Sequence, residues 1–273
     1  MQTEKVHFTK EKETMLVTLY GRALETQSQD PILRDPAAVE AVQRIDYDFE
    51  SLNVKWNDIL AIAARAKMFD LWVEEFLAGN PKASVLHLGC GLDSRVYRID
   101  PSPDVLWFDV DYPEIIDLRQ RLFPERANYR MIGSSVTDPA WLEQVPADRL
   151  ALIVAEGLMY YLKEDEVQAL VKRIVDRFPG GQIMFDAISR LYLKMQKTNV
   201  GISATGARMW WGIDDPHELE KWDSRIHLIT NLSVMDQSFP NIQKMSRGLR
   251  AVLRILAWIP ALKNMGLMLR YRY

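Results

Sequence analysis

Five short apolar segments with helical stretches between them constrain the fold of this 273-residue chain more than any other feature. The segments are residues 84–88, 105–108, 129–132, 150–155 and 182–186. They run without the alternation of apolar and polar residues that a half-exposed strand shows, which is typical of strands buried on both faces. The stretches at 113–122 and 163–178 are predicted to be crossover helices. Strands that alternate with helices in this way predict a parallel, doubly wound α/β sheet of the Rossmann-like kind.

The segments on either side of this alternation have different patterns. Apolar residues recur three and four apart over residues 12–77, which predicts helix, and Gly79 is the expected C-cap. Residues 187–224 break the strand–helix rhythm and are interpreted as an insertion. Residues 225–230 and 232–235 are predicted as two further strands. The sheet is therefore expected to be mostly parallel and seven-stranded.

A glycine loop after the first predicted strand carries the strongest functional signal. In VLHLGCGLDSR the strand runs into Gly89 and Gly91, where the missing Cβ permits a tight turn and a close ligand approach. Asp111 follows the second strand, 20 residues beyond Gly91. A carboxylate there can accept hydrogen bonds from both ribose hydroxyls, so the pattern predicts a nucleoside site. The alternatives are glycines that only shape a turn, an Asp111 that caps the next helix, and Asp109 as the ribose acid.

The chemistry of the nucleoside can be narrowed from the same loop. It lacks the third glycine of a dinucleotide fingerprint, which disfavours a nicotinamide-dependent oxidoreductase. S-adenosylmethionine carries no phosphate and needs a ribose acid, an apolar adenine slot, and polar groups for its ammonium and carboxylate. Arg65 could pair with that carboxylate, and Glu156, directly after the apolar run LALIVA, could hold the ammonium. A surface arginine and an acid at a helix N-terminus are the structural alternatives.

Five motifs follow one another within residues 22–162: RALETQSQDPILRDPAA, AARAKMFD, LGCGLDSRVYRI, FDVDYPEII and AEGLMYYL. In this order they resemble the leucine carboxyl methyltransferase family, including its bacterial branch of tetracenomycin-type polyketide O-methyltransferases. The combination of LGCGLDSR with VDYPE is the most specific part. The resemblance implies a class I methyltransferase fold with S-adenosyl-L-methionine as the cofactor.

The resemblance also implies roles for individual residues. Arg65 and Gly89 would contact the methionine moiety, Asp111 the ribose, and Glu156 the pocket that holds the methyl donor. Where the family usually places an aspartate for the adenine amine, GSSVTDPAW has Ser135, with Asp138 three residues later. The expected cofactor-binding residues are Arg65, Gly89, Cys90, Gly91, Asp111, Tyr112, Ser135, Val136 and Glu156.

The domain organisation follows from these assignments. We expect residues 1–80 to form an N-terminal helical cap that contributes to the cofactor site, and residues 81–273 to form the Rossmann-like methyltransferase core. The insertion at about 187–224 is expected to face the substrate.

Methyl transfer from a sulfonium is an in-line displacement that requires neither a metal nor a covalent intermediate. A carboxylate acceptor is already ionised at neutral pH, whereas an alcohol or phenol needs a general base. The catalytic candidates by residue type are Tyr160, His217 and His227. Surface or packing roles are the alternative for both histidines, and His87 is interpreted as an interior residue. An acceptor pocket, or alternatively core packing, is expected for Tyr160, Tyr161, Arg208, Trp210 and Trp211.

Composition limits the partners and the location. Lys and Arg total 34 against 37 Asp and Glu, which gives no overall attraction to nucleic acid or to an anionic membrane. The single cysteine, Cys90, cannot form an internal disulfide or a thiolate metal cluster and fits a reducing, cytoplasmic location. The polar N-terminus and the absence of an apolar run of about 18 residues predict neither a signal peptide nor an integral membrane segment. The expected partner is a small-molecule methyl acceptor, and the oligomeric state stays open.

The C-terminal region is locally basic. Residues 241–273 contain seven Lys and Arg and no Asp or Glu, with apolar residues at helical spacing. A helix packed across the sheet with a solvated face is expected, and a basic amphipathic helix on an anionic membrane is the alternative. The competing functions are a protein C-terminal carboxyl methyltransferase and a non-catalytic nucleoside-binding or peripheral membrane-binding protein.

Overall fold

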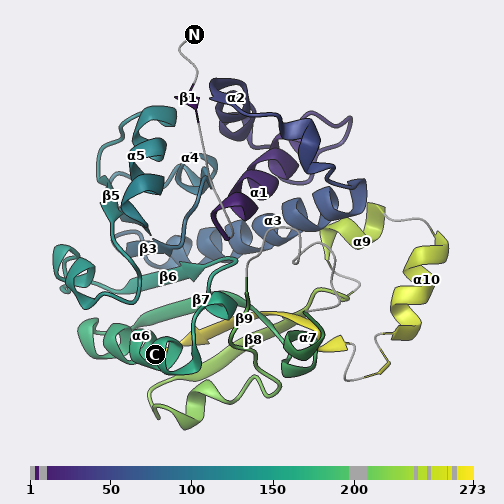
Figure 1. Cartoon of the computed structure of the whole chain (residues 1–273). Coiled ribbons are helices and arrows are strands. Elements are labelled where there is room, and N and C mark those ends of the chain that lie inside the picture. The colour runs from purple at the N-terminus through teal and green to yellow at the C-terminus, as the bar shows by residue number, and fades with distance from the viewer. Residues whose placement is uncertain are drawn as a thin grey trace.

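The computed structural model describes residues 4–5, 11–196, 208–236, 239–244, 247–256, 258–259 and 263–273. Within these ranges seven strands form one sheet in the order β5-β4-β3-β6-β7-β9-β8 (Figure 1). The strands are β3 (Ser84–Leu88), β4 (Leu106–Asp111), β5 (Tyr129–Gly133), β6 (Ala151–Ala155), β7 (Gly181–Ile188), β8 (His227–Ser233) and β9 (Gly266–Arg272). Two further short strands, β1 (Glu4–Lys5) and β2 (Ile45–Asp46), pair with each other in parallel.

The main sheet is mostly parallel, as predicted. Strands β5, β4, β3, β6 and β7 pair in parallel, and β9 pairs antiparallel with both β7 and β8. Because the chain runs outward from β3 through β4 and β5 and then returns to β6 on the other side, the strand order reverses between β3 and β6. Open α/β sheets bind ligands at such a reversal, beyond the carboxyl ends of the strands.

The prediction of two strands at 225–230 and 232–235 is wrong. One strand, β8, covers His227–Ser233, and the seventh strand is β9, which comes from the basic C-terminal region. As the edge strand, β8 alternates exposed and partly buried residues, and the chain turns at Val234. Strand β9 is buried from Leu267 to Tyr271, and the position of the one charged residue there, Arg270, is stabilised by an ion pair with Glu75 at 2.7 Å.

The N-terminal helical prediction is confirmed in type but not in continuity. Three helices, α1 (Glu11–Thr26), α2 (Pro36–Arg44) and α3 (Trp56–Gly79), replace one long periodic stretch. Asp35 starts α2 by accepting a hydrogen bond from the Ala38 N–H at 3.0 Å. Helix α3 runs through Gly79, and its C-cap is Asn80, one residue later than predicted.

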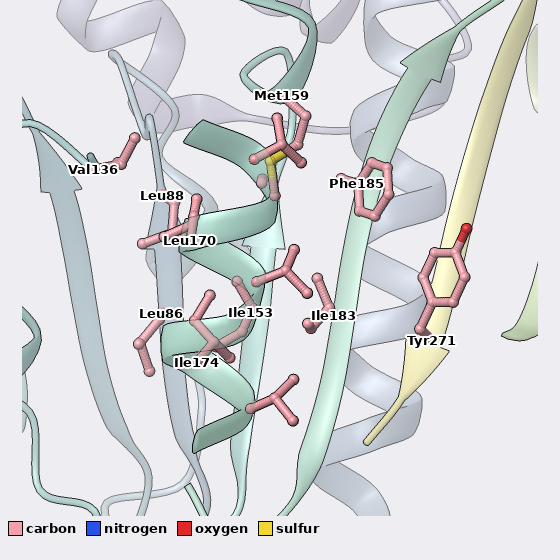
Figure 2. Close-up of a cluster of buried hydrophobic side chains, with 14 of the residues drawn as sticks. Leu86, Leu88, Val136, Ile153, Met159, Leu170, Ile174, Ile183, Phe185 and Tyr271 are labelled. Atoms are coloured by element: carbon pink, nitrogen blue, oxygen red, sulfur yellow. The ribbon is translucent and has the colours of Figure 1, made fainter. Parts of the chain in front are cut away.

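Helices cover both faces of the sheet. Helix α3 packs on one face, where Phe69 and Trp72 belong to the same buried cluster as Val85. Helix α6 (Glu164–Arg177) packs on the other, where Leu170 and Ile174 contact a cluster that contains Leu86 (Figure 2). Adjacent residues of β3 thus face opposite layers, which explains why the strand sequences are apolar without alternation.

The remaining connections complete the layers. The crossover helix predicted at 113–122 is α5 (Pro113–Leu122), and the one at 163–178 is α6. None of the helices in the described ranges combines the length and apolarity needed to cross a bilayer. The other elements are α4 (Arg95–Ile99), α7 (Arg190–Met195), α9 (Pro240–Lys244), α10 (Arg247–Leu256) and the 3-10 turns η1 (Phe49–Leu52), η2 (Pro139–Gln144), η3 (Met159–Tyr161) and η5 (Leu219–Lys221).

The C-terminal helix α10 does not pack across the sheet, contrary to the expectation. It lies beside the body of the molecule, beyond α9 (Figure 1). Its residues Val252 and Ile255 are 49% and 68% exposed, respectively.

Candidate active site

A cavity of about 1040 Å³ opens at the carboxyl ends of the central strands. Four parallel strands that are neighbours in the sheet bring residues to its wall. Gly89 follows β3, Asp111 ends β4, Glu156 follows β6, and Asp186 lies near the end of β7. The cavity therefore occupies the reversal point that the strand order defines. Its volume is at the upper end of the range for sites that hold one small molecule, which leaves room for two reactants.

The glycine loop adopts the conformation that its sequence predicts. Gly89 and Gly91 have φ angles of 61° and 49°, in the left-handed region that favours glycine. The Gly89 N–H donates to the Val110 carbonyl at 2.8 Å, and the Gly91 N–H donates to Asp111 Oδ2 at 2.7 Å. Asp111 Oδ1 accepts a second bond from the Tyr112 N–H at 2.7 Å. Loop and carboxylate thus form one rigid unit that lines the cavity, and burial raises the pKa of Asp111.

Asp109, the alternative ribose acid, has a different role. It is fully buried beneath the loop, forms an ion pair with Arg119, and accepts hydrogen bonds from the Tyr129 hydroxyl at 2.6 Å and the Trp107 indole at 2.8 Å. Burial opposes ionisation of Asp109, but Arg119 and the neighbouring His87 outweigh it, and its pKa lies at about 2. Arg119 also donates to the Gly91 carbonyl at 2.8 Å, so this pair supports the loop from below.

An alanine at Gly89 is expected to destabilise the protein by about 1–2 kcal/mol. The alanine would have to keep a backbone φ of 61°, and its Cβ would lie 2.9 Å from Leu158 Cδ1. Urea unfolding measures the effect, with Gly79→Ala as the matched control, because a Cβ at Gly79 meets nothing within 4 Å. A Gly89→Ala variant as stable as the control would contradict this account of the loop.

Arg65 is held between two carboxylates. Its Nε donates to Glu156 Oε1 at 2.9 Å, and its Nη1 donates to Asp186 Oδ2 at 2.9 Å. Asp186 Oδ1 in turn accepts the Gly157 N–H at 2.6 Å. Burial opposes ionisation of Glu156, but Arg65 and Arg95 keep its pKa below the usual range. The site therefore presents fixed charges of both signs within one cavity.

Asp186 was not predicted as a site residue. The sequence does carry a signal for it, since Asp186 lies near the end of an apolar strand just as Glu156 follows one. A deeper ion network was also missed. In it Arg95 Nε donates to Asp70 at 2.8 Å, and Arg98 contacts Asp70 and Asp93 at 2.8 and 2.6 Å. The pairs with Asp70 join residues 25 and 28 positions apart, so no local pattern could have indicated them.

The other residues predicted to bind the cofactor also line the cavity. They are Cys90, Tyr112, Ser135 and Val136. Burial raises the pKa of the Cys90 thiol, which keeps it neutral. The Ser135 hydroxyl lies 2.8 Å from the Thr137 hydroxyl, whereas Asp138 accepts the Ala140 N–H at 2.9 Å as the cap of η2 and does not line the cavity.

The structure separates the predicted catalytic candidates. Tyr160 lines the cavity beside Arg65, and burial raises the pKa of its hydroxyl well above the usual value. His217 lies on the surface, where its Nδ1 is 2.8 Å from Glu220, and His227 is exposed on β8. Neither histidine lines the cavity. His87 is buried within β3 at the base of the cavity, with Nε2 3.2 Å from Arg95 Nη1.

The aromatic residues predicted to line an acceptor pocket have divergent roles. Trp210 and Arg208 line the cavity, with the Arg208 guanidinium carbon 3.9 Å from the centroid of the Trp210 ring. Tyr161 also lines it. Trp211 is buried in the core, 5.9 Å from Phe185 between ring centroids, and does not reach the cavity.

Comparison with known proteins assigns the family. The sequence model of leucine carboxyl methyltransferases matches residues 15–175, more than half of the chain. The chain belongs to the leucine carboxyl methyltransferase family. The resemblance inferred from the five motifs is thereby confirmed, and the matched region carries Arg65, Gly89, Asp111 and Glu156.

Individual proteins agree with this assignment. The chain is 41% identical over 271 residues to the tetracenomycin polyketide synthesis O-methyltransferase TcmP of Streptomyces glaucescens, covering 99% of each chain. It is 36% identical to the S-adenosyl-L-methionine-dependent methyltransferase dpfgK of Gibberella zeae, covering 79% of this chain and 80% of dpfgK. A solved methyltransferase candidate from Thermobifida fusca has the same fold, with a TM-score of 0.59 and 17% identity over 97% of this chain and 94% of its own.

Proposed function

We propose that this protein is an S-adenosylmethionine-dependent O-methyltransferase that acts on a carboxylate or hydroxyl of a small, polyketide-like organic molecule. The observation that carries the proposal is the rigid unit of the Gly89–Gly91 loop and Asp111 at the reversal point of the sheet. The likeness to TcmP over the whole chain supports the oxygen acceptor, and the likeness to dpfgK supports the methyl donor.

The residues of the cavity suit the donor. A carboxylate can accept about four hydrogen bonds, and Asp111 uses two within the chain, which leaves acceptor capacity for the ribose hydroxyls. Arg65 would face the donor's carboxylate and Glu156 its ammonium, since charges of both signs suit a zwitterionic tail. Ser135 and Val136 would contact the adenine. The remaining contacts would come from Gly89, Cys90, Gly91 and Tyr112.

The chain's own residues limit the chemistry of the acceptor. When bound, the donor supplies an electrophilic methyl group, and the cavity excludes water and orients the acceptor oxygen. Tyr160 keeps its proton at neutral pH, so it can donate a hydrogen bond to the acceptor but cannot serve as a general base. His217 and His227 lie outside the cavity, and His87 at its base has its Nε2 3.2 Å from the donor Arg95 Nη1, so a carboxylate acceptor, which needs no base, is favoured over a hydroxyl.

The domain roles and the location belong to the same proposal. Residues 1–80 would act as a cap on the core of residues 81–273, because Arg22 of α1 and Arg65 of α3 both line the cavity. The insertion at about 187–224 would face the acceptor through Tyr192, Arg208 and Trp210. A cytoplasmic location is supported by the single, buried and reduced Cys90.

Calorimetric titration with S-adenosylhomocysteine, with NADH in parallel, tests the donor site. We expect S-adenosylhomocysteine to bind and NADH to give no heat of binding. Incubation with methyl-labelled S-adenosylmethionine and a panel of aromatic carboxylic acids, phenols and peptides ending in a free carboxylate then identifies the acceptor. Binding of NADH alone would overturn the proposal. Product binding with transfer only to peptides would indicate a protein carboxyl methyltransferase, and product binding with no transfer a non-catalytic protein.

A further inference from the structure

One segment of the chain begins and ends at the cavity wall, at Phe239 and Met265. Both residues line the cavity, and between them lie α9 and α10. Helix α9 is anchored, because Phe239 and Ile242 are buried in the cluster that α3 forms with the sheet. The return is also anchored, since the Ser233 hydroxyl donates to the Lys263 carbonyl at 2.6 Å. Helix α10 therefore lies between two points that are fixed to the body of the molecule, and it stands beside that body, beyond α9 (Figure 1).

Large apolar side chains of this segment are exposed together. Val252, Ile255, Trp258 and Ile259 are 49%, 68%, 85% and 47% exposed, respectively. They fall within eight residues, which is unlike the single scattered apolar residues of an ordinary protein surface. We call these four residues the apolar patch. A group of this kind indicates a surface that is covered in use.

The stretch of sequence that carries the apolar patch has basic residues and no acidic ones. Residues 237–273 contain seven Lys and Arg and no Asp or Glu. Lys244 is paired with Asp30 and Arg270 with Glu75, but no described carboxylate lies within ion-pair distance of Arg250, Arg254 or Lys263. By helical spacing, Arg250 and Arg254 fall on the side of α10 opposite Val252.

We propose that α10 and the apolar patch dock this protein on an anionic lipid bilayer. A short helix with a basic face and an apolar face, followed by an exposed tryptophan, is suited to the boundary between headgroups and acyl chains. Uncompensated arginines add attraction to anionic lipid. A second copy of the chain is a poor occupant, because a two-fold contact would place the same basic helix against itself.

The position of the helix gives this docking a consequence. Since Phe239 and Met265 line the cavity at the two ends of the segment, the bilayer would lie on the side of the molecule where this segment leaves the cavity wall. An apolar molecule dissolved in the membrane could then enter the cavity without crossing bulk water. The docking itself does not depend on the proposed methyl transfer.

Co-sedimentation of the full-length protein with vesicles tests the proposal. We expect binding to vesicles of three parts phosphatidylcholine and one part phosphatidylglycerol, weaker binding at high salt, and little binding to phosphatidylcholine alone. The double variant Ile255→Ser/Trp258→Ser should weaken binding by about tenfold or more. Arg250→Gln/Arg254→Gln should weaken it by about 25-fold, at about fivefold for each charge.

The matched control is Trp56→Ser/Ile229→Ser, which removes apolar side chains that are 51% and 43% exposed elsewhere on the molecule. It should bind vesicles as the unchanged protein does, and thermal unfolding verifies that each variant is folded. Three results would overturn the proposal: no vesicle binding, equal binding to neutral and anionic vesicles, or a dimer in solution that Ile255→Ser/Trp258→Ser converts to monomer without any vesicle binding.

Discussion

In an Asp111→Ala variant the affinity for S-adenosylhomocysteine is expected to fall by about 100-fold or more, while the fold is retained. Two hydrogen bonds from ribose hydroxyls to a charged acceptor contribute about 3 kcal/mol together, and alanine offers neither. The free energy of unfolding should change by about 1 kcal/mol or less, because the N–H groups of Gly91 and Tyr112 that lose Asp111 lie at the cavity, where water can replace it.

Calorimetric titration measures the affinity, and denaturant unfolding measures the stability of the same preparation. Asp138→Ala is the matched control, since Asp138 caps η2 and does not line the cavity. The control should bind the product normally. Equal affinities in Asp111→Ala and in the unchanged protein would show that Asp111 does not contact the ribose.

Replacing Asp109 with asparagine should reduce stability, in contrast to Asp111→Ala. We expect a loss of about 3–5 kcal/mol in the free energy of unfolding. The change leaves the fully buried Arg119 without its ionic partner and disturbs the bonds from Tyr129 and Trp107. Urea unfolding measures the loss. Asp148→Asn, at a side chain that is 71% exposed, is the matched control and should leave stability close to unchanged. A small effect at Asp109 would contradict the structural role assigned to it.

The ion pair of Asp109 with Arg119 predicts how the free energy of unfolding depends on pH. The pKa of Asp109 is about 2 in the folded protein, below the ordinary value of about 3.9 in the unfolded chain. A depressed folded-state pKa contributes stability that is fully present above the unfolded value and is lost as the pH falls through the folded value. We therefore expect Asp109 to contribute about 2 kcal/mol above pH ~4 that disappears toward pH ~2, and this loss should be absent in Asp109→Asn.

These two acids show where sequence reasoning ends. Asp109 and Asp111 are two positions apart in β4, so their side chains emerge on the same side of the strand, and no local pattern distinguishes them. The distinction comes from Arg119 on α5, which pairs with Asp109 and leaves Asp111 at the cavity. That contact depends on how α5 packs against the sheet.

The sequence alone determined the five parallel strands, the crossover helices and the glycine loop, because these depend on local periodicity and on the backbone freedom of glycine. Its ordered motifs also determined the family. Strand β9 escaped prediction because an antiparallel strand with basic residues has no distinctive local period, and it is strand only by pairing with β7 and β8.

Tertiary structure decided which polar side chains meet. The packing of α3 brings Arg65 to Glu156 and Asp186, which are 91 and 121 residues away in the chain. The tertiary structure also leaves His217 and His227 on the surface, although their residue type suited catalysis. The helices and the five parallel strands follow patterns of near neighbours in sequence, whereas the charge pairs of a site depend on distances that only the packed layers fix.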